Sequence, residues 1–505
     1  MKTNMKVLKG LTLAAAAVSG IAGAGYIRAT SLKAAPAAAP VTVRSALPSA
    51  ADAKMLLNMT TRHREWIVVP VSKETSVLAW VVYPERSDRA PVVMMRGETL
   101  EPSDWTRAVS DQLSAEGYLT VVPDVLTEVD SHGNRRSRGS LDTGEVARRE
   151  EAIRQAALRL PDAERALGTV ELGVSPSQLR IRTKQEQTSF FLSTAMWPTV
   201  VGYLNDRTGN KPPLIEENPH AMHMAMMAQA AAGKGLVTGD IGRKDPRLPA
   251  NYFMAKAAIR DSKLKAEWVD LPLEGETVKL HTLVINPTGT AKTGVVIVMQ
   301  HGVGVDDWQR ALAYQVAEDG FIAVLPDLWS GTGPNGGNWD ASEFVDDAVR
   351  NAAGKVSPEE GMKRYKAARE WALKLPRANG KSGSIGFCAG GGNSFRFATE
   401  VPELNAAVVY YGGAPTTGRG GPPNEELLGK IKAPVLGLYG ENDGRMAEDV
   451  MTTQAVMARL GKQYEAHVYP KTTHSFAMFQ HIGTNAASIA DAWPRTIAFF
   501  KKNLS

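Results

Sequence analysis

The sequence predicts an α/β protein built from two tandem copies of a doubly wound, mostly parallel sheet. Three observations support this: segments about 202 residues apart share a residue pattern, each copy alternates apolar strands with helices, and the composition is globular. The 505 residues are 43% hydrophobic and 22% charged, with 46 glycines and 29 prolines. This composition excludes wholesale disorder, collagen-like repeats and polytopic membrane proteins.

The internal repeat joins three pairs of segments. Residues 65–70 recur as 267–272 at an offset of 202, and 104–105 and 116–124 recur as 307–308 and 319–327 at an offset of 203. We therefore predict one copy over residues 61–260, containing an insert, and a second over 261–505.

Both copies open with the same elements. A β-branched strand (77–83; 278–285) precedes a continuous apolar strand (91–95; 295–299), a helix (104–116; 307–319) and another apolar strand (119–122; 321–325). Continuous apolar runs are typical of buried parallel strands, and strand, helix and strand in this order imply a right-handed βαβ unit.

The second copy continues this alternation to its end. We expect helices at 359–375, at 393–399 and at 490–503, the last with Pro494 in its first turns. Strands are expected at 382–387, 406–411, 433–439 and 464–469.

The amino terminus predicts an exported protein. Lys2, Lys6 and Lys9 precede a mostly apolar stretch at 11–22, and the small residues of 22–24 suit a cleavage site. We expect a signal peptide over 1–24, a linker over 25–60 and a periplasmic or extracellular location. A retained anchor is the alternative, although the apolar stretch is shorter than the roughly 20 residues that span a bilayer.

The net charge gives no support for a nucleic-acid partner. The formal charge is +5, but six positive charges precede the first acidic residue, Asp52, and 5 − 6 leaves −1 for the rest. Binding to phosphate needs a basic surface on the folded domain. The sequence predicts no oligomeric state.

The single cysteine, Cys388, lies in a nucleophile motif. Residues 386–391 read GFCAGG between a predicted strand and a predicted helix, which is the strand-to-helix elbow that exposes a nucleophile. The amide of Ala389 would face an oxyanion, and the helix N-terminus favours the thiolate. A lone buried cysteine is otherwise a small hydrophobic residue.

An acid and a histidine follow in the expected order. Asp443 comes after the strand at 433–439 and His474 after the strand at 464–469. Open α/β sheets place their sites at the carboxyl ends of strands. Singly each residue is more often a turn former or a core histidine, but together they predict a Cys388–His474–Asp443 triad.

These motifs resemble the dienelactone hydrolase family of α/β-hydrolases. The resemblance rests on GFCAGG at 386–391, the context of Asp443, the string 474–476 (HSF) and the segment 296–305, and it covers roughly residues 271–504. It implies that Cys388 is the nucleophile, His474 the base and Asp443 its orienting acid. The oxyanion would be held by the amides of Ala389 and of Gly302 or Val303.

Two positions depart from the family pattern. His301 stands where the family has a glutamate, and Met478 stands where it has an arginine two residues after Phe476. The carboxylate clamp is therefore missing, which does not favour a carboxylate-bearing dienelactone as substrate. Aromatic residues, Trp329 and Phe476 among them, would wall an apolar pocket or simply form core; the others are Trp339, Tyr411 and Phe479.

The first copy lacks the motif at the predicted place. An offset of 203 puts its elbow near 388 − 203 = 185, where residues 182–186 read RTKQE. We therefore expect a catalytically silent copy that packs on the second or binds something. No cofactor or metal is predicted, because the His- and Met-containing stretch 220–227 is better explained as a core helix than as a copper site.

The sequence thus predicts an exported cysteine hydrolase of esters or lactones that works through an acyl-enzyme. A thioesterase or peptidase on the same scaffold is the first alternative, because fold does not fix the acyl group. A binding protein without catalysis is the second, and the intact triad weighs against it.

Overall fold

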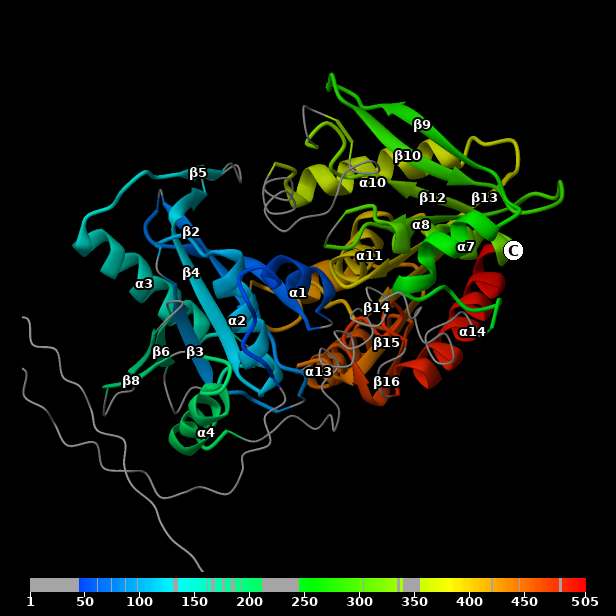
Figure 1. Ribbon diagram of the computed structural model, residues 1–505. Helices are drawn as coiled ribbons and strands as arrows, with labels where there is room; N and C mark the ends of the chain where they lie inside the picture. The colour runs from blue at the N-terminus through cyan, green and yellow to red at the C-terminus, as the bar shows by residue number, and fades with distance from the viewer. Residues whose placement is uncertain are drawn as a thin grey trace, which may run out of the picture. The chain divides into compact units, whose positions relative to one another are not determined.

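The computed structural model contains two β-sheets with helices packed on both faces of each (Figure 1). It describes residues 45–210 and 245–505, except for 61, 74, 87, 98, 130–134, 161, 165–168, 175–177, 183–186, 192, 303, 334–336, 339–354, 419–420, 445 and 481–483. The described residues belong to one compact unit. Among them, no helix has the length and apolarity to span a membrane.

The second sheet confirms the predicted doubly wound, mostly parallel layout. Its strand order is β16-β15-β14-β13-β11-β12-β10-β9; β10 runs antiparallel to both of its neighbours, β9 and β12, and the other pairs are parallel. The strands are β9 (Ala266–Pro272), β10 (Lys279–Ile285), β11 (Thr293–Met299), β12 (Ile322–Pro326), β13 (Ala378–Phe387), β14 (Ala406–Tyr410), β15 (Val435–Asn442) and β16 (Tyr464–Thr473).

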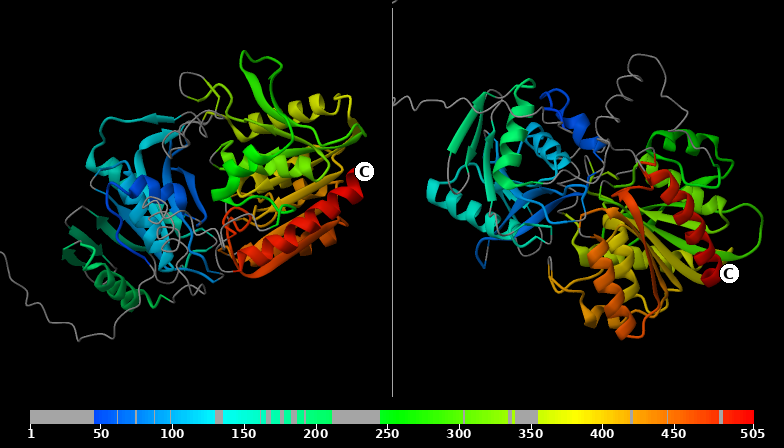
Figure 2. Two further views of the ribbon diagram at one scale, coloured as in Figure 1. Left: turned by 45° about the vertical axis from the view of Figure 1, so that its right-hand side comes forward. Right: turned by 90° about the horizontal axis from the view of Figure 1, so that it is seen from below.

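Helices cover this sheet on both faces. One face packs against α7 (Ala255–Asp261), α8 (Asp307–Glu318) and α14 (Asn485–Leu504), the last drawn in red in Figure 2. The other packs against α10 (Pro358–Ala372), α11 (Ala389–Glu400), α12 (Glu425–Gly429) and α13 (Met446–Arg459). The sheet is buried on both sides, which explains why its strands read as continuous apolar runs.

The second half begins earlier than the predicted boundary at residue 261. Ala250 and Ala255 are buried in the core of the second sheet, and the indole Nε1 of Trp308 donates to the carbonyl of Ala250 at 3.0 Å. The short helix η1 (Tyr252–Met254) and α7 therefore pack as part of the second half, which we count from residue 248 onward.

The first sheet has the order β1-β2-β4-β3-β6-β7-β8, with β5 paired to β4. Its strands are β1 (Arg64–Pro70), β2 (Ser76–Val82), β3 (Val92–Arg96), β4 (Leu119–Val129), β5 (Arg135–Ser137), β6 (Thr169–Val174), β7 (Gln178–Arg182) and β8 (Gln187–Phe191). Helices α1 (Ala53–Met59), α2 (Asp104–Ala115) and α4 (Trp197–Thr208) cover one face, and α3 (Thr143–Ala157) covers the other.

The mostly parallel prediction is wrong for this first sheet. Only the pairs β3–β4 and β3–β6 are parallel, and the other pairs are antiparallel. Parallel neighbours need a long crossover, usually a helix, whereas antiparallel strands can follow one another directly. Strands β6, β7 and β8 are joined by segments too short for such a crossover.

The predicted linker at 25–60 also ends earlier than expected. The backbone amide of Ser45 donates to the carboxylate of Glu116 at 2.5 Å, and Ala53 and Leu57 of α1 are fully buried against α2 and the sheet. These contacts make residues from Ser45 onward part of the first half. The predicted signal peptide at 1–24 lies outside the described residues and stays a prediction.

The two sheets begin alike. The order β1-β2-β4-β3-β6 matches β9-β10-β12-β11-β13, with the same parallel or antiparallel sense at each pairing. Beyond β6 the first sheet continues into the antiparallel β7, whereas β13 leads into helix α11. The origin of the halves by duplication stays a prediction.

Strand register shows that the position corresponding to the elbow in the first half differs from the one predicted by the repeat offset. At the repeat offset of 203, Arg96 corresponds to Met299; Arg96 pairs with Gly173 and Met299 with Gly386. The two glycines therefore correspond at an offset of 386 − 173 = 213. The offset of 203 does not hold this far along the chain, because the segments between the strands differ in length.

The corrected register assigns Ser175 to the place of Cys388, 185 − 175 = 10 residues before the predicted position. Ser175 and residues 183–186 lie outside the described residues. In the sequence, the residue after Ser175 is Pro176, which has no amide N–H to offer an oxyanion. The first half therefore departs from the elbow pattern in chemistry as well as in topology.

Candidate active site

Cys388 lies at the turn between β13 and α11. Its amide donates to the carbonyl of Tyr410 at 3.1 Å, and its carbonyl accepts from the amide of Gly392 at 3.1 Å. Its backbone adopts φ 55° and ψ −121°, a conformation that non-glycine residues rarely take. This is the strained elbow geometry that the motif predicts.

Glycines make the elbow possible. A Cβ added to Gly386 would lie 1.9 Å from the carbonyl oxygen of Gly390, and one added to Gly390 would lie 2.6 Å from that of Met299. Contacts this short do not occur between real atoms, so α11 can approach the strands only because both positions lack a side chain.

Asp443 and His474 form a buried hydrogen-bonded pair. Nδ1 of His474 lies 2.8 Å from Oδ2 of Asp443, and each side chain is 3% exposed. Burial lowers the pKa of His474, but the charges on Asp443 and Cys388 outweigh it and raise that pKa well above its usual value. Nε2 has no hydrogen-bond partner among the described residues, so it is available on the side away from Asp443.

The loop that carries His474 is held by Asn485, which the sequence analysis did not single out. The fully buried amide of Asn485 accepts from the amide of Thr473 at 3.2 Å and donates to the Thr473 hydroxyl and the Phe479 carbonyl at 3.0 Å. A polar residue at the start of an amphipathic helix was the only sequence signal. Asn485 is a positioning residue.

Backbone strain gathers at this site. Four described non-glycine residues have positive φ, and three of them are Cys388, Tyr411 (φ 36°) and Ser475 (φ 57°), the last directly after His474. The Tyr411 ring packs on that of His474 with centroids 4.9 Å apart. Strained residues persist where the surrounding structure holds them, and they cluster at functional sites.

The predicted oxyanion donors are brought together in part. Ala389 is the first residue of α11, so its amide lies at the positive end of the helix. A Cβ added to Gly302 would lie 4.0 Å from the Cβ of Ala389, which places the two residues side by side. Val303 lies outside the described residues.

The remaining predicted pocket residues are spread over different surroundings. Phe476 is buried against Tyr411 in the core on the α8 and α14 face, whereas Trp329 is buried in the core on the opposite face. His301 is buried beside Asp306, with Nε2 and Oδ1 3.3 Å apart. Trp339 and the stretch 220–227 lie outside the described residues.

His63, from the first half, also reaches this site and was missed by the sequence analysis. Its ring centroid lies 4.7 Å from that of His474, at an interplanar angle of 76°. Cys388 Sγ and one ring nitrogen each of His63 and His474 lie within 4.8 Å of one another. His63 precedes Cys388 by 325 residues, and no sequence spacing connects them.

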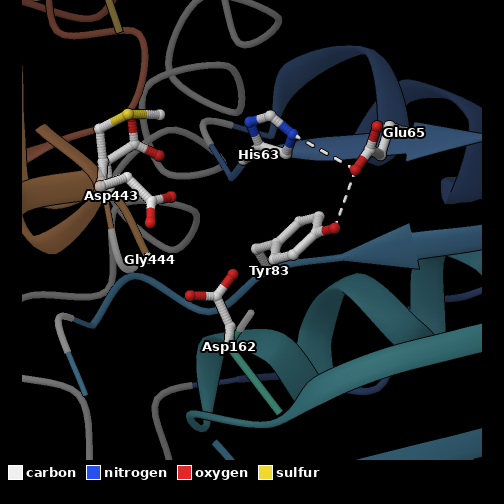
Figure 3. A pocket seen from close by; sticks show the side chains of 8 residues that line it. His63, Glu65, Tyr83, Asp162, Asp443 and Gly444 are labelled. Atoms are coloured by element: carbon white, nitrogen blue, oxygen red, sulfur yellow. Dashed lines mark hydrogen bonds and ion pairs between the residues drawn. The ribbon is translucent and has the colours of Figure 1, made fainter. Parts of the chain in front are cut away.

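Strand pairing explains the position of His63. It comes directly before β1, where its carbonyl accepts from the amide of Tyr83 at 2.9 Å, extending the β1–β2 ladder. The rings of His63 and Tyr83 pack edge to face, with centroids 4.9 Å apart. The Tyr83 hydroxyl donates to Glu65 at 2.8 Å, and Nε2 of His63 lies 4.0 Å from the same carboxylate (Figure 3).

A pocket of about 130 Å³ adjoins this cluster (Figure 3). Its lining is largely acidic and comprises His63, Glu65, Tyr83, Asp162, Asp443, Gly444, Met446 and Asp449. Four carboxylates in a small recess favour neutral or cationic groups over anions.

Residues 280–504 match the model of the dienelactone hydrolase family. The second half is a dienelactone hydrolase family domain. This match supports a hydrolase of the ester or lactone type, and the mixed sheet with helices on both faces is an α/β architecture.

Individual relatives are similar to about half of the chain. Proteins of Escherichia coli K12 and Yersinia pestis, both named "Putative carboxymethylenebutenolidase", are 27% identical over 262 residues and 29% identical over 215. These alignments cover 50% and 41% of this chain and 94% and 78% of the relatives. The crystal structure of a dienelactone hydrolase from Anabaena variabilis is 18% identical with a TM-score of 0.36, covering 48% of this chain and 100% of that one.

Proposed function

We propose that the protein hydrolyses carboxylic esters or lactones with Cys388 as nucleophile, His474 as base and Asp443 as orienting acid. The observation that carries this proposal is the buried Asp443–His474 pair, whose free ring nitrogen lies on the side of a cysteine held at a strained elbow. A nucleophile, a base and an orienter in this arrangement are the requirements for acyl transfer.

The reaction follows from these positions. Nε2 of His474 takes the proton of the Cys388 thiol, the sulfur attacks the ester carbonyl carbon, and the carbonyl electron pair moves to the oxygen, where the amides of Ala389 and Gly302 stabilise it. Collapse of this adduct breaks the bond to the leaving oxygen, which takes a proton from Nε2 of His474. A water then loses a proton to His474 and attacks the thioester carbonyl carbon. The carbon–sulfur bond breaks, the acid is released, and the Cys388 sulfur takes the proton back from His474.

The substrate we propose is neutral. The position where the family resemblance expects an arginine holds Met478, which is buried in the core with its amide bonded to the Ser475 carbonyl at 2.9 Å. The adjoining pocket carries four carboxylates and no lysine or arginine in its lining. Both features weigh against a substrate whose own carboxylate must bind beside the triad.

A substrate panel tests this function. Neutral aryl esters, neutral lactones, thioesters and a carboxylate-bearing lactone are assayed with wild type and Cys388→Ala, and we expect the variant to lose at least about 10³-fold in kcat on the neutral esters. Alkylation of the single cysteine should abolish the same activity. Full activity in Cys388→Ala would refute the assignment.

A matched pair of histidine variants separates chemistry from folding. His474 directly follows β16, whereas His467 lies within β16 and forms an exposed ion pair with Glu465. His474→Ala should lose activity, and His467→Ala should keep it. Equal losses in both variants would show that damage to the strand, rather than to the triad, explains the result.

We also propose that the protein is exported and that the first half is catalytically silent. The leader at 1–24 and the Pro176 that follows Ser175 support these proposals. Fractionation of the native host and amino-terminal sequencing of the mature protein test export, with a new terminus near residue 25 expected. Ser175→Ala should leave hydrolysis unchanged.

A further inference from the structure

Three soft or borderline donors converge at the site from two distant parts of the chain. The Cys388 sulfur and one ring nitrogen each of His63 and His474 all lie within 4.8 Å of one another. His63 is supplied by the first sheet and the other two by the second. Imidazole and thiolate are the ligands that Zn²⁺ and neighbouring transition metals prefer.

The spacing needs only a small closure to hold such an ion. Zinc–sulfur and zinc–nitrogen bonds of about 2.3 and 2.0 Å place tetrahedral donors about 3.5 Å apart. The three donor atoms, which now lie within 4.8 Å of one another, must therefore approach by about 1 Å, and rotation of the side chains can supply this movement. The His63 side chain is 29% exposed, so it has room to move.

A carboxylate lies near one ring nitrogen of each histidine, His63 and His474. Asp443 holds Nδ1 of His474 at 2.8 Å, and Glu65 lies 4.0 Å from Nε2 of His63. Metal-bound histidines typically direct their second nitrogen to such a carboxylate, which fixes the ring and strengthens the ligand. Nε2 of His474 is buried without a hydrogen-bond partner among the described residues, so it is free to bind an ion.

The surroundings favour a cation. The neighbouring pocket of about 130 Å³ is lined by His63 and by four carboxylates, those of Glu65, Asp162, Asp443 and Asp449. This pocket has room for a water as a fourth ligand, the arrangement found in zinc sites with three protein ligands.

We propose that His63, Cys388 and His474 bind Zn²⁺ or a similar divalent transition metal and that this ion reversibly inhibits hydrolysis. A bound ion occupies the sulfur that would attack the substrate and the nitrogen that would carry the proton. The binding part of the proposal stands on geometry alone, whereas the inhibition part rests on the proposed function. The first half would thus act on the second by supplying the third ligand.

Cobalt is the direct probe of binding. Full-length protein freed of metal with a chelator is titrated with Co²⁺, and we expect one equivalent to produce a near-ultraviolet sulfur-to-cobalt charge-transfer band that Cys388→Ala lacks. Zn²⁺ should displace the cobalt, abolish ester hydrolysis in proportion to the ion bound, and be reversed by chelator. Absence of a stoichiometric band in wild type would overturn the proposal.

Variants test the contribution of the first half. His63→Ala should weaken zinc binding at least about 100-fold, since loss of a ligand exceeds the roughly 10- to 100-fold loss from a second-shell partner. Glu65→Gln, which keeps an acceptor for Tyr83, should fall within that second-shell range, and His467→Ala should bind zinc as wild type does. Thermal melting checks that each variant folds.

The outcomes separate the two proposals. Wild-type zinc affinity in both His63→Ala and Glu65→Gln would overturn the site, even if Cys388→Ala shows that the triad hydrolyses esters. A cobalt band in a protein that hydrolyses no ester would leave the metal site standing and refute the proposed function. Zinc that binds at this site but leaves hydrolysis intact would refute inhibition.

Discussion

Replacing Gly386 by alanine should lower the rate of hydrolysis, because the added side chain displaces the elbow that carries Cys388. The added Cβ would lie 1.9 Å from the carbonyl oxygen of Gly390, and real Cβ atoms essentially never come closer than 3.0 Å, so the backbone must shift by at least 3.0 − 1.9 = 1.1 Å. The obstructing atoms are backbone and cannot rotate away. A displacement of about 1 Å at a catalytic group costs about 10²-fold in rate. Overpacking of this kind also costs about 1–3 kcal/mol of stability.

Gly392→Ala is the matched control. Gly392 lies in α11, on the other side of the elbow from Gly386, and its added Cβ would meet only the carbonyl oxygen of Gly413 at 3.6 Å, an ordinary contact. Alanine should stabilise the helix by about 1 kcal/mol, so activity is kept and the melting temperature holds or rises. The assay is kcat/KM on a neutral ester together with thermal unfolding. Gly386→Ala within threefold of wild type, while still folded, would refute the reasoning.

Three further substitutions follow from the contacts. Asp443→Asn should lower kcat by about 10³- to 10⁴-fold while the melting temperature changes little, because His474 loses the partner that fixes its tautomer. Asn485→Ala should cost about 2–4 kcal/mol in denaturant unfolding and lower kcat, since it leaves buried backbone groups unpaired; wild-type values would show that the loop holds itself. Burial raises the pKa of Asp319 although the indole of Trp493 donates to its carboxylate at 2.9 Å. Because this pKa is higher in the folded than in the unfolded state, the contribution of Asp319 to the free energy of unfolding is fully present below the unfolded pKa and is lost as the pH rises through the raised value. Asp319→Asn should therefore raise the unfolding free energy at pH 7 and leave it unchanged at pH 3, and an equal gain at both pH values would contradict this account.

The second sheet could be predicted closely because its strands are buried on both faces. The run expected at 382–387 is the end of β13 (Ala378–Phe387), and the helix expected at 490–503 lies within α14 (Asn485–Leu504). The order of nucleophile, acid and histidine followed from the same pattern, since each residue comes at the carboxyl end of a parallel strand. Local patterns thus sufficed where each element is apolar and continuous.

The other parts of the candidate site could not be predicted, because they depend on contacts between residues far apart in the sequence. His63 reaches Cys388 because the ladder between β1 and β2 extends by one residue and because the two halves pack in one compact unit. Asn485 holds the loop of His474 through three hydrogen bonds that only the folded chain brings together. The elbow position in the first half was misplaced because a repeat offset assumes segments of equal length.

The two halves differ at the strand end that carries the elbow in the second half. In the second half β13 turns through Cys388 into α11, whereas the next described element after β6 is the antiparallel β7, so among the described residues no helix begins at the end of β6. A strand in that place offers no aligned amides for an oxyanion. The first sheet nevertheless contributes His63, Glu65 and Tyr83 to the recess beside the triad. Substitutions at these three residues would therefore alter the recess beside Cys388 while leaving the elbow of the second half intact.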